Sequence, residues 1–135
     1  MEARPTQITE FLNGEKQMMI PLFQRGYEWA KEHWETLWLD ILEQYEKGDE
    51  DAAPVHFTGA IVTAPARAIP VGISKYLVID GQQRLTTIAV LLCALRARFP
   101  SDTPQCRRIN RLLKNEDGES LDQFKLLPTQ LDREA

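Results

Sequence analysis

Cysteine is scarce in this sequence. The 135 residues include only Cys93 and Cys106, and they form no CxxC pair. A disulfide framework and a cysteine-rich zinc site are therefore excluded within these residues, and a reducing cytoplasm is the expected location. Cys93 falls in an apolar stretch, so it is predicted to be a small core residue.

Long apolar runs and an excess of positive charge are missing as well. No apolar run is long enough to cross a bilayer, so no membrane partner is expected. Residues 1–14 lack the basic and apolar regions of a signal peptide. The net charge is −4, which disfavours binding of duplex nucleic acid by the chain as a whole and leaves room only for a local basic site.

Several common catalytic motifs are also absent from the sequence. There is no GxxxxGK[ST] stretch, which excludes a P-loop nucleotide hydrolase, and no HExxH or GxSxG. No pair of histidines has the arrangement of an HNH nuclease. His56 stands alone, and a lone histidine is more often structural or exposed than catalytic.

What is present predicts one small α+β domain over residues 1–135. Hydrophobic residues make up 43% and charged residues 27%, the balance of an ordinary globular protein. Helical spacing and end signals predict helices, and stretches rich in Val, Ile and aromatic residues predict strands. Helices are expected at 5–13, 33–48, 82–99 and 105–115, and strands at 16–23, 55–64, 75–80 and near 124–127. The C-terminal stretch has nothing after it to pack on, which suggests the N-terminal part of a longer protein.

Two of the expected helices carry an apolar face. In 82–99 the face predicts a central helix, and in 33–48 the spacing predicts an amphipathic helix. Thr6 is expected to cap the first helix. The apolar face of the 82–99 helix consists of Leu85, Ile88, Ala89, Leu92, Leu95 and Phe99. The apolar face of the 33–48 helix consists of Trp34, Leu37, Trp38, Ile41, Leu42 and Tyr45.

The junction between the strand at 75–80 and the helix at 82–99 is the most informative site. Asp80 is predicted to cap the helix, and Gly81 permits a close backbone approach. Arg84 lies one turn into the helix, where its guanidinium can reach the helix start, and Thr87 adds a hydroxyl. Unpaired N–H groups and the helix dipole make such a junction able to bind a phosphate. The alternative is that Asp80 serves only as a cap and Arg84 only as a structural ion-pair partner.

A second polar cluster follows the first predicted strand. Gln24 and Arg25 are flanked by Tyr27 and Trp29, and an arginine beside aromatic rings suits a phosphate together with a base or ribose. The alternative is a surface loop whose aromatic rings pack against the helix at 33–48. Further along, Gly59 lies in a predicted strand, where glycine often marks a close approach of the backbone.

Three stretches together resemble one bacterial family. "IPLFQRGYEW" (20–29), "HFTGAIV" (56–62) and "VIDGQQRLTTIAVLL" (78–92) are similar to the DGQQR family, also called domain of unknown function 262. This is the N-terminal module of GmrSD-type modification-dependent restriction enzymes and related phage-defence proteins. The resemblance covers about residues 6 to 132, and the uninterrupted DGQQRLTT (80–87) is its most specific part.

The resemblance implies a ParB/sulfiredoxin-like fold with a short mixed sheet packed against helices. It also implies binding and hydrolysis of a nucleoside triphosphate with Mg²⁺ or another divalent cation, regulating DNA cleavage by a domain outside this chain. A homodimer is compatible with it. Carried over residue by residue, the catalytic candidates are Asp80, Gln82, Gln83 and Arg84, the nucleotide-binding candidates are Gln24, Arg25, Tyr27, Trp29, Gly81, Arg84 and Thr87, and the metal candidate is Asp80.

Two other functions fit the same residues. The first is a ParB-like DNA-binding or nuclease domain without nucleotide hydrolysis, in which Arg25 and Arg84 hold a DNA phosphate. The second is a protein-interaction domain that keeps the DGQQR residues for structure only. Steep salt dependence of DNA binding would favour the former, and absence of nucleotide binding would favour the latter.

Overall fold

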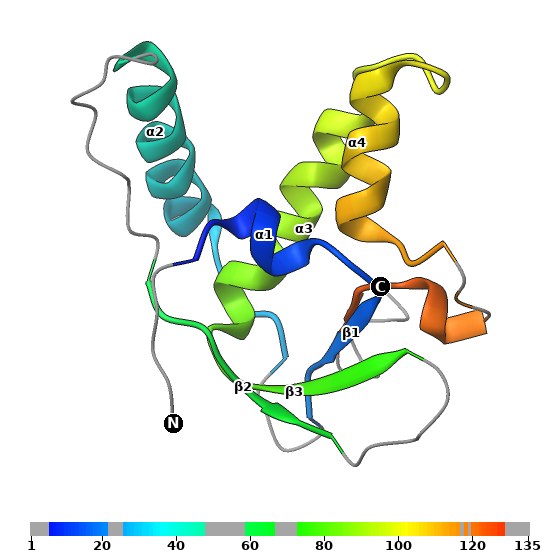
Figure 1. Cartoon of the computed structure of the whole chain (residues 1–135). Coiled ribbons are helices and arrows are strands. Elements are labelled where there is room, and N and C mark those ends of the chain that lie inside the picture. The colour runs from blue at the N-terminus through cyan, green and yellow to red at the C-terminus, as the bar shows by residue number, and fades with distance from the viewer. Residues whose placement is uncertain are drawn as a thin grey trace.

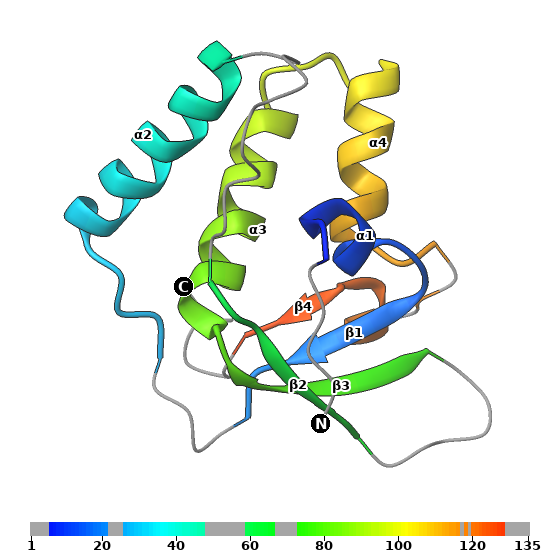
Figure 2. The same ribbon diagram turned by 60° about the vertical axis from the view of Figure 1, so that its left-hand side comes forward.

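The fold places a small mixed sheet beneath a layer of helices (Figures 1 and 2). The computed structural model describes residues 6–21, 26–47, 59–66, 73–116, 118 and 120–128. The predicted α+β class is confirmed. Along the chain the elements are α1 Ile8–Leu12, β1 Lys16–Met19, α2 Lys31–Lys47, β2 Val62–Pro65, β3 Ser74–Asp80, α3 Gln82–Arg96, α4 Pro104–Leu113, the 3-10 turn Ser120–Gln123 and β4 Leu126–Leu127.

The sheet has the strand order β2-β3-β1-β4. Strand β1 pairs in parallel with both β3 and β4, while β2 and β3 pair in antiparallel fashion. In register, Met18 lies between Tyr76 and Leu126, so these three side chains share a face. That face points to the helices, because Met18 is fully buried in the core and Tyr76 and Leu126 pack against the same cluster.

The core is small and centred on the first turns of α3. Leu85 and Val78 are at most 1% exposed, and Leu92 packs against the same cluster from one side. Toward the C-terminal end of α3 the predicted apolar stripe leaves the core, since Leu95 and Phe99 are more than a third exposed. The prediction of a central helix is therefore correct for its N-terminal half only.

Helix α2 differs most from the sequence expectation. It forms over the predicted residues, but none of its side chains is buried. Trp34 is 47% exposed, Trp38 46% and Tyr45 82%. In Figures 1 and 2 the helix rises on the same side of the sheet as α3 and leans away from it. The amphipathic spacing predicted the helix correctly, but it carries no information about a partner surface, and the apolar face stays partly exposed.

Two smaller expectations are also wrong. Residue Gln7 and not Thr6 occupies the N-cap of α1, and no side chain caps that helix. Cys93 is exposed, whereas Cys106 on α4 is buried. Among the helices formed by the described residues, none combines the length and the apolar character that spanning a membrane requires.

Buried polar side chains fasten the C-terminal segment to β1. Asn115 is 3% exposed; its Oδ1 accepts from the Lys16 amide at 3.2 Å, and its Nδ2 donates to the carbonyls of Lys16 and Asp122, both at 2.9 Å. Gln17 is 1% exposed and donates to the Leu121 carbonyl at 2.7 Å. The contacts that involve Lys16 and Gln17 join residues about a hundred positions apart, so they fix the edge at which β4 is added to the sheet.

Lys125 makes a third tie of this kind. Its ammonium is 3% exposed and donates to the carbonyls of Leu12, at 2.6 Å, and Arg111. Burial lowers the pKa of Lys125 below its ordinary value of 10.5. The unfolded chain therefore holds this proton to higher pH than the folded chain, so the Lys125 contribution to stability rises as the pH approaches 10.5.

We expect Asn115→Ala to lower the free energy of unfolding by about 2–3 kcal/mol, because backbone groups of Lys16 and Asp122 lose their partners in a buried place. Chemical denaturation followed by circular dichroism measures the change. The control is Asn13→Ala, the same substitution at an exposed position, which should stay within about 0.5 kcal/mol of the parent. Equal effects of the two substitutions would contradict the structural role of Asn115.

Candidate functional site

The turn between β3 and α3 is built on a glycine. Gly81 occupies the N-cap of α3 in the left-handed region, with φ 91° and ψ 13°. A Cβ at this position would lie 2.9 Å from the Ala60 carbonyl oxygen and 3.0 Å from the Ile61 side chain. Both the dihedral angles and the lack of space therefore require glycine here.

The prediction that Asp80 caps α3 is wrong. The cap position is Gly81, which has no side chain, and no side-chain cap bond forms at this helix. The Asp80 Oδ1 atom instead accepts from the Gly81 amide at 2.8 Å. Within the described residues its second carboxylate oxygen has no partner, and the side chain is exposed, so this oxygen faces solvent at the end of β3.

Strand pairing is irregular where β3 meets the site. Val62 pairs with Asp80, but the next residue, Thr63, pairs with Val78. The β3 strand therefore contains one extra residue, Ile79, at its carboxyl end. Such a bulge bends a strand and re-aims the side chains beside it, and here it lies directly before the turn that carries the DGQQR residues.

Arg84 lies across the backbone that precedes β2. Its Nη2 donates to the Ala60 carbonyl at 2.6 Å. A Cβ on Gly59, whose φ is +117°, would come within 2.7 Å of the guanidinium carbon. The predicted close approach at Gly59 is thus confirmed, and the group that approaches is the Arg84 side chain. Gly59 itself lies before β2 and not in the predicted strand.

Most N–H donors of the Arg84 guanidinium have no acceptor among the described residues. Its Nε is buried without an acceptor among the residues that the structure describes. None of the ion pairs in the same residues involves Arg84, so the alternative of a structural ion pair finds no support there. The guanidinium is therefore anchored by a backbone carbonyl while its charge is left uncompensated by these residues.

Backbone amides at the start of α3 add to this positive character. The first helical bond of α3 runs from the Leu85 amide to the Gly81 carbonyl, at 3.0 Å. Across the described part of the chain, the amides of Gln83 and Arg84 have no acceptor. Free N–H groups, the positive end of the helix dipole and a guanidinium together form a place suited to an anion.

Gln83 joins the junction to the segment before α2. Its Oε1 accepts from the amides of Glu28, at 2.8 Å, and Trp29, at 3.2 Å. Its Nε2 donates to the Gly26 carbonyl at 3.0 Å. The Gln83 side-chain amide thus provides the hydrogen-bond partners of three backbone groups in the 26–29 segment. Sequence reasoning missed this role, since a separation of 54 to 57 positions leaves no local signal.

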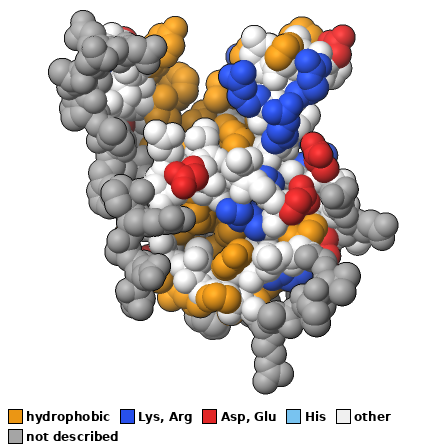
Figure 3. Space-filling model, viewed as in Figure 1, with side chains coloured by type: hydrophobic (Ala, Val, Ile, Leu, Met, Phe, Trp, Pro, Cys, Tyr) orange, Lys and Arg blue, Asp and Glu red, His pale blue; other side chains and the backbone are white. Residues whose placement is uncertain are grey.

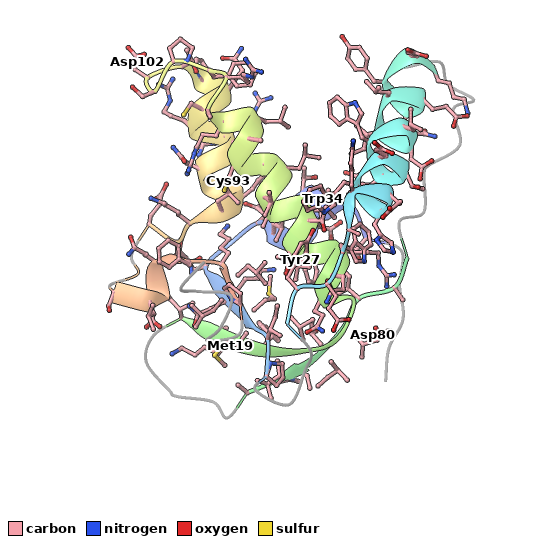
Figure 4. The ribbon with its side chains drawn as sticks, turned by 180° about the vertical axis from the view of Figure 1, so that it is seen from behind. Met19, Tyr27, Trp34, Asp80, Cys93 and Asp102 are labelled. Carbon is pink, nitrogen blue, oxygen red and sulfur yellow. The ribbon has the colours of Figure 1, made fainter. Side chains whose placement is uncertain are left out.

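A chain of hydrogen bonds holds the Tyr27 side chain against Thr87, one turn after Gln83 on α3. The Trp34 indole donates to the Tyr27 hydroxyl at 2.6 Å, and that hydroxyl lies 2.6 Å from Thr87 Oγ1. Thr87 donates to the Gln83 carbonyl at 2.8 Å. Because an indole only donates and a carbonyl only accepts, Tyr27 is the donor to Thr87. Figure 4 shows Tyr27 and Trp34 beside the first turns of α3, with Asp80 at the end of β3.

Trp29 forms a short wall next to this chain. Its ring stacks on His33 with centroids 5.4 Å apart. The Ala30 amide donates to His33 Nδ1 at 3.0 Å, so the imidazole is held in place as an acceptor. The aromatic rings therefore pack against the beginning of α2, as the alternative reading of this cluster predicts, and they also border the DGQQR turn.

The structure brings together seven of the predicted site residues. They lie on the β3–α3 turn, the first turns of α3 and the 26–29 segment, and Gln82 is buried among them. Gln24, Arg25 and His56 lie outside the described residues. The seven are Asp80, Gly81, Gln82, Gln83, Arg84, Thr87 and Tyr27, with Trp29 at their border.

The donors for a metal ion are few. Within the ranges that the structure describes, no group of three or more His, Cys, Asp and Glu side chains could hold a metal. The free oxygen of Asp80 fits a single contact to Mg²⁺, an ion that proteins commonly hold through one or two carboxylates together with substrate phosphates. A dedicated metal cage does not fit this part of the chain.

Comparison with known protein families decides the relationship. Residues 8–135 match the family described as GmrSD restriction endonuclease, N-terminal domain. The chain belongs to this family. The predicted relationship is thereby confirmed, and the GmrSD N-terminal domain described here is part of a restriction system. A comparison with curated proteins finds no match.

We expect Gly81→Ala to destabilise the GmrSD N-terminal domain by about 2–3 kcal/mol, because it adds backbone strain and a clash with the Ala60 carbonyl. The matched control is Gly14→Ala, where φ is +85° and a Cβ would meet nothing within 4 Å. That control should cost only the strain, about 1 kcal/mol. Denaturant unfolding of both variants gives the comparison, and equal losses would argue against the close approach.

A second prediction concerns the hydroxyl chain. Tyr27→Phe should weaken folding by about 1 kcal/mol, and the loss should be smaller once Thr87→Val is present, since the two side chains share one bond. A double-mutant cycle by chemical denaturation measures this coupling. Tyr45→Phe, at a tyrosine 82% exposed, is the control and should change little. Strict additivity of the two substitutions would contradict the bond.

Proposed function

We propose that the β3–α3 junction binds the phosphates of a nucleoside triphosphate. The observation that carries this proposal is the Arg84 guanidinium, anchored on the Ala60 carbonyl with no carboxylate partner among the described residues. It lies next to the amides of Gln83 and Arg84 at the start of α3. An anion is the ligand that such an arrangement stabilises, through charge-assisted hydrogen bonds.

The neighbouring side chains suit the rest of a nucleotide. Trp29 and Tyr27 border the junction, and the Tyr27 hydroxyl is fixed by Trp34 and Thr87. An aromatic wall beside a phosphate site favours a base or ribose, because any base can stack on a ring. Arg25 and Gln24 precede this wall in the sequence, and we propose that they contact the phosphates as well.

Hydrolysis would be achieved by positioning and charge stabilisation. Arg84 stabilises negative charge on the transferred phosphoryl group, and Asp80 directs its free oxygen toward solvent, where it can hold Mg²⁺ or orient a water. Mg²⁺ bound with the triphosphate would neutralise phosphate charge. The three bonds of Gln83 to the 26–29 segment favour a positioning role for it. They leave Gln82 as the better candidate for orienting the attacking water.

In the restriction system this activity would regulate a partner domain. The family name ties the module to an endonuclease, and the described residues carry no metal-binding cluster of the kind a nuclease uses. We therefore propose a nucleotide-hydrolysing module that controls DNA cleavage by a domain outside this chain.

Calorimetric titration with GTP, ATP, CTP and UTP, with and without Mg²⁺, tests the site. We expect saturable binding by the parent chain, loss of binding in Arg84→Ala and unchanged binding in Arg98→Ala, an exposed arginine beyond the end of α3. Gly59→Ala retains the arginine but displaces it, so it should also weaken binding. If hydrolysis occurs, the rate of phosphate release should be lower in Arg84→Ala than in the parent. The decrease should correspond to a loss of about 2–4 kcal/mol of transition-state stabilisation.

Two results would contradict the proposal. Equal nucleotide binding by folded Arg84→Ala and the parent would remove Arg84 from the site. No binding of any nucleotide at millimolar concentration would favour a purely structural role for the DGQQR residues.

A further inference from the structure

Positive charge is concentrated at one end of the domain. The chain as a whole has a net charge of −4. Residues 96–116 nevertheless contain six cations and only two carboxylates, Asp102 and Glu116. We call these cations the α4 basic face; they are Arg96, Arg98, Arg107, Arg108, Arg111 and Lys114.

Helix α4 separates its cations from its apolar side chains. At 100° per residue, Arg107 and Arg111 fall within a narrow stripe, and Arg108 widens it on one side. Lys114 follows directly as the C-cap residue of the helix. Cys106 on the opposite side is buried, and Leu112 packs against the core. Figure 3 shows Lys and Arg side chains gathered over α4, with single acidic residues above and below the group.

The cations of the α4 basic face are not used to hold the fold together by ion pairs. The ion pairs among the described residues join Lys31 to Glu35, Lys47 to Glu43 and Lys75 to Asp122. In the α4 basic face, Arg107 donates to the Asp102 carbonyl and Arg96 to Asn110 Oδ1. Both acceptors are neutral, so six positive charges remain uncompensated in this part of the structure.

We propose that the α4 basic face binds the phosphate backbone of duplex DNA without reading its bases. Five of the six cations are arginines, whose planar guanidinium matches phosphate oxygens. Single strands are usually held by aromatic rings interleaved with the cations, but the only aromatic residue among positions 96–116 is Phe99. A helical stripe of cations without stacking rings therefore fits a duplex backbone better than a single strand.

The dimensions agree with contacts to a few phosphates. The row of cations from Arg107 to Lys114 rises by about 10 Å along the helix, which spans two or three phosphates of one strand. Beside it lies an open hollow of about 450 Å³ lined by Arg96, Ala97, Phe99, Ser101, Cys106, Asn110 and Lys114. A phosphate at its rim would meet Arg96 and Lys114, and the single Phe99 ring in the lining is too few for the row of stacking rings typical of single-strand sites.

This surface is separate from the proposed nucleotide site. Arg84 and Arg96 lie at opposite ends of α3, about 18 Å apart along its axis. The proposal therefore does not rest on nucleotide binding, and a failure of one leaves the other intact. It gives the domain a DNA contact of its own, in addition to the DNA contacts expected from regions outside this chain.

Filter binding of a 20-base-pair duplex of arbitrary sequence over a salt series tests the proposal. Each neutralised phosphate contributes a slope of about −0.9 to log K against log salt. We expect Arg107→Gln/Arg111→Gln to reduce the slope by about 2 and to weaken binding at least about tenfold at low salt. Arg107→Lys/Arg111→Lys should keep the slope, because the charges remain.

The control variant removes the same charge elsewhere. Lys31→Gln/Lys47→Gln lowers the net charge equally, at two lysines that are already paired on α2, and it should leave DNA binding nearly unchanged. Equal weakening by both double variants, or no duplex binding at low salt, would overturn the proposal. Tighter binding of a single strand than of the duplex would also overturn it.

One further outcome would assign the face differently. The outward side of α2 is rich in carboxylates, so a second copy of the chain could meet the α4 basic face instead of DNA. Self-association that disappears in Arg107→Gln/Arg111→Gln and is competed poorly by DNA would overturn DNA as the partner. Sedimentation equilibrium at several protein concentrations distinguishes this outcome, and a parent chain that stays monomeric without DNA supports the proposal.

Discussion

The close approach of two backbone segments organises the candidate site. The 60–61 backbone passes the β3–α3 turn at a distance that requires glycine at residue 81, and the Arg84 guanidinium fills the space beside Gly59. Because the backbone comes so near, the Ala60 carbonyl can hold the Arg84 guanidinium across it. The bulge in β3, the left-handed turn and the orientation of Arg84 all belong to this single arrangement. A side chain at Gly81 would separate the hairpin from the helix start, and one at Gly59 would displace the Arg84 guanidinium.

The same helix also holds the segment that leads into α2. Gln83 and Thr87 face the 26–29 segment one turn apart, and between them they bind backbone groups and the Tyr27 hydroxyl. Helix α2 has no buried residue of its own, so its placement depends largely on these polar contacts. A ligand that shifts the first turns of α3 would therefore also shift the start of α2, because the hydrogen bonds of Gln83 and Thr87 connect the two.

Sequence reasoning was most successful where the signal is local. The α+β class and the family membership followed from periodicity and from the DGQQR motif, and Gly59 was correctly tied to a close approach. It failed for Asp80, whose side chain bonds to the adjacent amide while Gly81 takes the cap position. Strand β3 ends at Asp80 and Gly81 follows in the left-handed conformation, so Asp80 lies one position before the N-cap of α3.

The remaining errors share one physical cause. Apolar spacing in α2 predicted an amphipathic helix, but burial of its apolar face needs a partner surface that spacing does not specify. The ties made by Gln17, Asn115 and Lys125 were not anticipated, because each joins a buried polar group to a carbonyl or amide far away in the sequence. Such contacts depend on how the sheet assembles, and nothing in the neighbouring residues announces them. Gln24, Arg25 and His56 lie outside the described residues, so their predicted roles stay predictions.

The position of the tryptophans has a practical consequence for anyone who studies this domain by optical methods. All three indoles, Trp29, Trp34 and Trp38, fall within ten positions of one another, and none belongs to the core cluster. Trp34 is bonded to Tyr27 and Trp29 is stacked on His33, so intrinsic emission reports on the border of the candidate site and on α2. A tryptophan-detected melting curve would therefore follow the release of these contacts with the first turns of α3, and it would report on the sheet and its core only through α3.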